Sequence, residues 1–259
     1  MKAVIFAGGY GTRLSEETDI KPKPMVEIGG RPILWHIMKS YAHYGIEEFI
    51  ICLGYKGQII KQYFIEYYHH NSDLTINLKN GKSKIINSQA ENWKVTLADT
   101  GQNTQTGGRL KRISKYLSPN DDFCLTYGDG ISNVNISKLI KFHKSHDKLA
   151  TITAVQTPGR FGVLKTDKKN KVLQFNEKPN NQTGRINGGF FVLKPKVLDF
   201  IADDLTSWEK GPLTLLANKG QLMSYKHDGF WQPCDTLRDK RYLEHLWTNG
   251  DVPWKVWKS

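Results

Sequence analysis

The stretch KAVIFAGGYGTRL, residues 2–14, opens with a short apolar run that leads directly into a glycine-rich turn. A continuous apolar run bounded by glycines predicts a buried β-strand. Gly8, Gly9 and Gly11 allow backbone N–H groups to approach a phosphate closely, and Arg13 adds a permanent positive charge with several donors. The stretch therefore predicts either a phosphate-binding loop at the tip of the first strand or a plain surface turn that carries an arginine.

This turn departs from two common phosphate-binding motifs. A P-loop requires a Gly-Lys-Ser or Gly-Lys-Thr sequence, and none lies near the first strand. A dinucleotide-binding fingerprint requires a third glycine, but Thr12, Arg13 and Leu14 follow Gly11. If the turn binds phosphate, it is a loop of a different kind.

Helical and strand-like patterns alternate over the first 155 residues. Periodic apolar positions predict helices over residues 31–45, 57–70, 106–117 and 135–147. Apolar runs predict strands over residues 48–54, 93–101, 121–130 and 149–156, and Asn80-Gly81 predicts a hairpin over residues 74–87. We therefore expect an α/β fold with a mixed, mainly parallel sheet and helices on both faces.

The pattern changes after residue 155. Residues 159–179 predict a hairpin around residues 168–171, residues 187–195 predict a strand, and the end of the chain is expected to be mostly helical. Because no linker interrupts the sequence, we expect one domain over residues 1–259, with a core mainly over 1–155 and a C-terminal α+β elaboration mainly over 156–259.

Composition limits the classes of function. The net charge is +12, and its lysines and arginines are spread along the chain, which fits a solvated basic surface, nucleic acid or a polyanionic small substrate. The three cysteines match no metal-binding spacing and no disulfide framework, so a reducing cytoplasm is expected. No apolar run approaches the roughly 18 residues of a membrane span, so we expect no membrane partner.

A second candidate phosphate ligand lies in KPKPM, residues 21–25. Lys23 stands between Pro22 and Pro24, whose rings fix φ and disfavour helix. An extended segment that presents the lysine in one direction is predicted. Taken alone, the motif is better explained as a surface lysine-proline loop.

In combination these motifs resemble the sugar-1-phosphate nucleotidylyltransferase family. The resemblance rests on GGYGTRL, PKP, YGDG, FNEKP, INGGFFVL and FWQPCDT, so it covers nearly the whole chain. It implies a Rossmann-like sheet of the nucleotide-diphospho-sugar transferase type and a Mg²⁺-dependent, in-line attack of a sugar phosphate on the α-phosphate of a nucleoside triphosphate. TGGRLKR, YGDG and GFWQPCDTLRDK look like the members that make CDP-glucose from CTP and glucose 1-phosphate; the same chemistry with UTP or dTTP is the alternative.

The resemblance also implies roles for individual residues. Arg13 and Lys23 are expected to be catalytic, and Asp129 and Asp235 to hold the metal. The residues expected to bind nucleotide are Phe6, Ala7, Gly8, Gly9, Gly11, Thr12, Arg13, Lys23, Gly107, Gly108, Arg109, Gly128 and Asp129. The residues expected to bind the sugar phosphate are Tyr127, Gly128, Glu177, Lys178, Asn187 and Gly188.

Arg109 receives a more specific expectation, because its guanidinium could donate to the ring nitrogen and carbonyl of cytosine and would oppose the N–H of uracil.

Two alternatives belong to other classes of protein. The charge alone supports a nucleic-acid-binding protein, and a non-catalytic regulator could share the fold, although such a regulator is expected to lack a phosphate- or metal-binding residue. We expect CTP and glucose 1-phosphate as partners, no nucleic acid, and an assembly of identical chains. The aromatic tail with Trp247, Trp254 and Trp257 either packs on its own domain or joins a neighbour.

Overall fold

A seven-stranded sheet forms the centre of the molecule. The computed structural model describes residues 1–11, 14–156, 163–166, 172–176 and 184–258. The strand order is β14-β10-β13-β8-β1-β4-β7, and only β13 runs against its neighbours β10 and β8. The bounds of these strands are β1 Ala3–Ala7, β4 Glu48–Leu53, β7 Lys94–Asp99, β8 Phe123–Tyr127, β10 Ala150–Val155, β13 Ile186–Leu193 and β14 Leu222–His227. The expected α/β fold with a mixed, mainly parallel sheet is confirmed.

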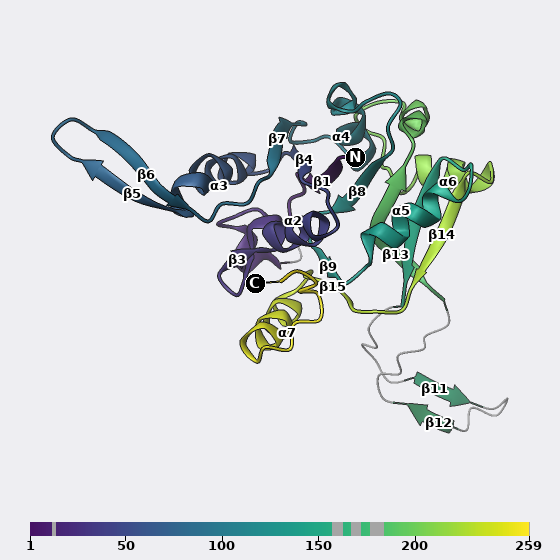
Figure 1. Cartoon of the computed structure of the whole chain (residues 1–259). Helices are drawn as coiled ribbons and strands as arrows, with labels where there is room; N and C mark the ends of the chain where they lie inside the picture. Colours follow the sequence, from purple (N-terminus) through teal and green to yellow (C-terminus); the bar gives the residue numbers. More distant parts are fainter. Residues whose placement is uncertain (12–13, 157–162, 167–171, 177–183, 259) are drawn as a thin grey trace.

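The first strand shows why the opening stretch decides this fold. All five residues of β1 are buried, because successive side chains point to opposite faces and both faces are covered. Ala3, Ile5 and Ala7 join one apolar core, while Val4 and Phe6 join the other. A strand with two apolar faces is stable only between two layers of helices, which is the arrangement seen in Figure 1.

Helices on both faces complete the layers. Residues of α2 (Ile33–His43), α3 (Gly57–His70), α5 (Ile136–Lys144) and α7 (Leu237–Thr248) belong to one core. Residues of α4 (Thr106–Arg112), the 3₁₀ segment η4 (Pro195–Phe200) and α6 (Pro212–Asn218) belong to the other. No helix in the described part of the chain has the length and apolar character that a membrane span requires.

Smaller elements surround the sheet. The Asn80-Gly81 hairpin is confirmed as β5 (Ser72–Asn77) and β6 (Lys82–Ser88), which extend away from the sheet in Figure 1. The two strands of the later hairpin are confirmed as β11 (Val163–Thr166) and β12 (Val172–Asn176), which pair antiparallel; the turn expected at 168–171 lies outside the described residues. Two further pairs are β2 (Glu27–Ile28) with β3 (Arg31–Pro32), and β9 (Gly130–Ser132) with β15 (Trp231–Pro233). The short helix α1 covers Ser15–Thr18.

Three local predictions are corrected. The helix expected over residues 106–117 ends at Arg112, and a separate 3₁₀ turn, η3, follows over Ser114–Tyr116. The C-terminal region is not mostly helical, because β14 adds a parallel edge strand beside β10 and β15 pairs with β9. Residues Lys23–Met25 form a 3₁₀ turn, η2, rather than an extended segment, since the φ that proline imposes also suits a 3₁₀ turn.

The aromatic tail packs on its own domain. Trp254 and Trp257 are buried in the same core as β1, and Trp247 packs against that core. The buried imidazole of His36 on α2 lies at the centre of this group, where Trp254 Nε1 donates to His36 Nδ1 at 3.4 Å. The C-terminal end of the chain is thus part of the folded domain.

Candidate active site

A cavity of about 480 Å³ opens at the carboxyl end of the parallel strands. It lies between the ends of β1 and β8, which is where the chain order of the sheet reverses. In open α/β sheets such a switch point leaves a crevice, because the connections leave the two strands in opposite directions. The lining residues are Phe6, Ala7, Gly8, Gly9, Tyr10, Gly11, Lys23, Pro24, Gln102, Asn103, Thr104, Gln105, Thr106, Arg109, Tyr127, Gly128 and Asp129.

The glycine-rich turn forms one wall of this cavity. Gly8, Gly9 and Gly11 all line it, as expected of a loop that presents backbone to a ligand. A side chain at Gly8 would collide with the guanidinium of Arg109, so this glycine is required for a close approach. Thr12 and Arg13 lie outside the described residues, and their assignment to the phosphates stays a prediction.

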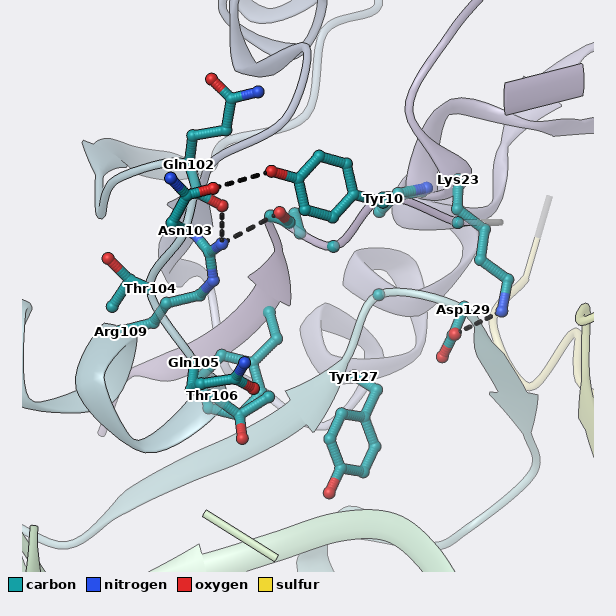
Figure 2. A pocket seen from close by; sticks show the side chains of 17 residues that line it. Tyr10, Lys23, Gln102, Asn103, Thr104, Gln105, Thr106, Arg109, Tyr127 and Asp129 are labelled. Carbon is teal, nitrogen blue, oxygen red and sulfur yellow. Dashed lines mark hydrogen bonds and ion pairs between the residues drawn. The ribbon is translucent and has the colours of Figure 1, made fainter. Parts of the chain in front are cut away.

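Lys23 forms the charged centre of the site. Its side chain is 9% exposed, and its Nζ lies 2.6 Å from Asp129 Oδ2. Figure 2 draws this ion pair as a dashed line. The same ammonium donates to Asp235 Oδ1. One buried lysine therefore holds together two carboxylates that are far apart in the sequence.

The pairing of β9 with β15 explains how these carboxylates meet. Pro233 lies opposite Gly130 in that pair, and Cys234 N donates to the backbone oxygen of Asp129 at 2.9 Å. The backbone N–H of Asp235 is in turn held by Asp239, which also completes a capping box at the start of α7. The two acidic residues predicted from YGDG and QPCDT are therefore brought together by backbone pairing.

The ionisation of Lys23 reflects this surrounding. Burial by itself would lower the pKa of the ammonium, but the charges of Asp129 and Asp235 and their hydrogen bonds outweigh it, so the pKa is raised. The lysine consequently stays protonated at neutral pH.

The same geometry bears on metal binding. Asp129 and Asp235 direct one oxygen each at a single cation, the Lys23 ammonium. Mg²⁺ commonly binds through one or two carboxylates together with substrate phosphates and water. No group of three or more His, Cys, Asp or Glu side chains that could hold a metal occurs among the described residues. The pair thus fits a metal that is held partly by a phosphate ligand.

Arg109 is held by protein oxygens. It donates from Nη1 to Leu53 O, Thr100 Oγ1 and Gly101 O, and from Nη2 to Gly8 O and Gln102 O, at 2.7 to 3.2 Å. The side chain is 4% exposed, and burial lowers its pKa. The N–H groups of Nη1 and Nη2 are therefore directed at protein oxygens, which ties the phosphate loop to the ends of β4 and β7. These contacts do not test direct donation to cytosine, which stays a prediction; Arg109 itself is among the residues that line the cavity.

The loop after β7 supplies polar wall residues that the sequence analysis missed. Gln102, Asn103, Thr104, Gln105 and Thr106 line the cavity, and Tyr10 Oη donates to Asn103 Oδ1 at 2.9 Å across its mouth (Figure 2). Gly107 and Gly108 follow directly but are not among the lining residues. The sequence did offer a signal for these residues. A run of amide and hydroxyl side chains follows a predicted parallel strand, at the same sheet edge as the phosphate loop.

The residues expected at the sugar phosphate are only partly described. Tyr127 and Gly128 line the cavity, and Asn187 Nδ2 donates to Tyr127 Oη at 3.3 Å. The backbone oxygen of Gly188 accepts from Trp231 Nε1 at 2.8 Å, and neither Asn187 nor Gly188 is among the lining residues. Glu177 and Lys178 lie outside the described residues, so their place in the site stays a prediction.

A glycine-rich loop, a buried lysine and two converging carboxylates at a switch point are the parts that transfer of a phosphorus-centred group requires. The chain belongs to the nucleotidyl transferase family, whose model matches residues 2–231. Enzymes of this family typically use a divalent metal.

Particular relatives narrow the comparison. The chain is 55% identical over 258 residues to the glucose-1-phosphate cytidylyltransferase of Salmonella typhimurium, with 100% of each chain covered. It is 32% identical over 247 residues to the mannose-1-phosphate guanyltransferase of Saccharomyces cerevisiae, covering 92% of this chain and 63% of that one. Among solved structures, a UDP-glucose pyrophosphorylase complexed with UDP-glucose matches with a TM-score of 0.68 at 15% identity, covering 96% and 99% of the two chains. That last likeness shows the fold alone.

Proposed function

We propose that this chain is a glucose-1-phosphate cytidylyltransferase that makes CDP-glucose and pyrophosphate from CTP and glucose 1-phosphate. The observation that carries the reaction type is the buried Lys23 ammonium, held between Asp129 and Asp235 at the mouth of the phosphate loop. Identity of 55% over full length to a protein of that name supports the choice of substrates.

The chemistry requires alignment and charge neutralisation more than proton transfer. A phosphate oxygen of glucose 1-phosphate forms a bond to the α-phosphorus of CTP, while the bond from that phosphorus to the bridging oxygen of the β-phosphate breaks. Pyrophosphate leaves with the electron pair. Because a phosphate monoester has a second pKa of about 6, the attacking oxygen is already ionised near neutral pH, and no protein base is needed.

Lys23 acts on the reacting phosphates. An ammonium has three N–H donors; Asp129 and Asp235 take two of them, and the third can reach a phosphate oxygen. Since the pKa of Lys23 is raised, the charge is present throughout the neutral range. The lysine holds the α-phosphate and the attacking phosphate together, and its charge offsets the negative charge that develops between them.

Mg²⁺, held by Asp129 and Asp235 together with phosphate oxygens, would neutralise the triphosphate and stabilise the pyrophosphate that leaves. The backbone N–H groups of the phosphate loop, with Thr12 and Arg13, bind the β- and γ-phosphates. Residues 102–106 bind the base, because their amide and hydroxyl groups line the cavity. Tyr127, Glu177, Lys178, Asn187 and Gly188 bind the glucose 1-phosphate. We also propose an assembly of identical chains, which sedimentation equilibrium tests.

The experiment that tests this function follows the label of the α-phosphate. Enzyme is incubated with Mg²⁺, glucose 1-phosphate and CTP that carries ³²P at the α-position, and the products are separated by anion exchange. The label is expected in CDP-glucose, with one unlabelled pyrophosphate released per turnover. Label that appears in CMP, or that stays in CTP, would contradict the proposal.

A further inference from the structure

A segment between η4 and α6 packs along the start of α4. This segment, residues 201–209, is called the brace below. Gln105 N donates to the backbone oxygen of Asp204 at 2.8 Å, and Gly108 N donates to the backbone oxygen of Thr206 at 3.2 Å. A Cβ on Gly108 would lie 2.5 Å from the Cα of Asp204. The glycines of TGGRLKR are thus required for the close approach of the brace, which fixes the residues just before α4 that line the cavity.

Glu209, at the end of the brace, uses both carboxylate oxygens. Its Oε1 accepts from Tyr127 Oη at 2.7 Å, and its Oε2 accepts from Thr106 Oγ1 at 2.7 Å and from Ser207 Oγ at 2.9 Å. Thr106 lines the cavity from the start of α4 and Tyr127 lines it from the end of β8 (Figure 2), whereas Glu209 is not among the lining residues. One carboxylate therefore joins two walls without itself facing the ligand space.

The hydrogen-bond chain continues from Tyr127 to the sugar-phosphate side. Asn187 Nδ2 donates to Tyr127 Oη at 3.3 Å, and Asn187 Oδ1 accepts from Gly189 N at 2.8 Å. The Tyr127 hydroxyl is the donor in its contact with Glu209 Oε1 at 2.7 Å, which leaves its oxygen to accept from Asn187. Because an ionised carboxylate only accepts, the direction of each hydrogen bond in the chain is determined.

We propose that Glu209 is a positioning residue that couples the nucleotide subsite at Thr106 to the sugar-phosphate subsite at Tyr127 and Asn187. The inference rests on the proposed function for the identity of the two substrates. When CTP binds against residues 102–106, Glu209 holds Tyr127 and Asn187 in place for glucose 1-phosphate. Bound CTP therefore raises the affinity for glucose 1-phosphate, and bound glucose 1-phosphate raises the affinity for CTP by the same factor.

The test is steady-state kinetics of Glu209→Gln, Thr106→Val and Tyr127→Phe, and of the double variants that contain Glu209→Gln. A glutamine cannot accept from both walls, because its amide nitrogen is a donor. Glu209→Gln is expected to raise KM for CTP and for glucose 1-phosphate by at least about fivefold each. Thr106→Val is expected to raise KM for glucose 1-phosphate as well as for CTP, and Tyr127→Phe to raise KM for CTP as well as for glucose 1-phosphate. Both KM values of each double variant are expected to lie within about twofold of those of Glu209→Gln alone.

The matched control is Glu244→Gln. Glu244 is also half-buried and also joins two segments, by accepting from Gly29 N on the far side of the domain. Its loss is expected to lower the melting temperature without changing either KM. The coupling would be overturned if Glu209→Gln changed only one of the two KM values. It would also be overturned if the fold-changes in KM of two single variants multiplied in their double variant. If Glu209→Gln does not fold, the distant-substrate effects of the other two single variants decide. A wild-type enzyme that releases no pyrophosphate from the two substrates would instead overturn the proposed function and the coupling with it.

Discussion

Replacing Lys23 by methionine removes one charge and keeps most of the side-chain volume. In the structure this charge is 2.6 Å from Asp129 and also in hydrogen-bond contact with Asp235. The variant therefore loses its link to the reacting phosphates and loses the ammonium that lies between the two carboxylates. Two separate effects follow, one on the rate and one on stability.

The size of each effect follows from these contacts. Removing one preorganised donor to the transition state lowers kcat by about a hundredfold or more, which corresponds to about 2.7 kcal/mol. Breaking a fully buried ion pair costs roughly 3–5 kcal/mol of unfolding free energy. Because the Asp129 side chain is 32% exposed and water can reach it, we expect a smaller loss of about 1–3 kcal/mol. Added Mg²⁺ should restore part of it, since the cation can take the place of the ammonium between the two carboxylates.

Pyrophosphate release and thermal melting measure these effects. Lys21→Met is the matched control, because Lys21 lies two residues earlier and, among the described residues, forms an ion pair with Glu27 at 3.1 Å, away from the two carboxylates. The control should retain its kcat and show no added stabilisation by Mg²⁺ relative to wild type. A Lys23→Met enzyme whose kcat lies within tenfold of wild type would remove Lys23 from the chemistry.

Four further results are expected. A chelator should abolish pyrophosphate release and Mg²⁺ should restore it, while Asp129→Asn and Asp235→Asn should each raise the Mg²⁺ concentration needed for half-maximal rate; full activity in excess chelator would exclude a metal. Arg109→Ala should lower the melting temperature and raise KM for CTP by about tenfold, because the guanidinium no longer joins the loops after β1, β4 and β7. The preference for CTP over UTP should stay within about threefold of wild type; loss of that preference would show that Arg109 contacts the base. Lys178→Ala should raise KM for glucose 1-phosphate far more than KM for CTP, and equal changes would contradict its placement at the sugar phosphate. Burial lowers the pKa of His36 from 6.5 to about 4, so the folded state binds fewer protons than the unfolded one between these values, and stability should fall by up to about 3 kcal/mol as the pH drops from 6.5 to 4; an acid-denaturation profile unchanged in His36→Gln would contradict this.

Much of the fold could be predicted because its signals are local. The five-residue apolar run of β1 and the periodic apolar face of α3 each follow from patterns within a few residues. The edge strand β14 could not be predicted in the same way, because LMSYKH carries no strong alternation and becomes a strand only by pairing with β10. The end of α4 at Arg112 also lacked a sequence signal, because the apolar periodicity continues to Leu117 while the chain turns into η3 over Ser114–Tyr116.

The site was predictable where one short motif supplies the geometry. Lys23 and Asp129 are expected because PKP and YGDG resemble motifs of the family, and the pairing of β9 with β15 brings Asp235 to them. The role of Arg109 could not be read from GGRLKR, because its five acceptors come from three separate strand ends and loops. Glu209 had no sequence signal at all, since a single acidic residue in a loop becomes informative only when its two partners are known.

The most direct measurement compares nucleotides at the one site. Pyrophosphate release is followed with glucose 1-phosphate and, in turn, CTP, UTP, dTTP, GTP and ATP, each with Mg²⁺ and with excess chelator. We expect kcat/KM to be highest for CTP by at least about tenfold, with no release in the presence of chelator. A higher kcat/KM for another nucleotide, or no release with any of them, would contradict the assignment.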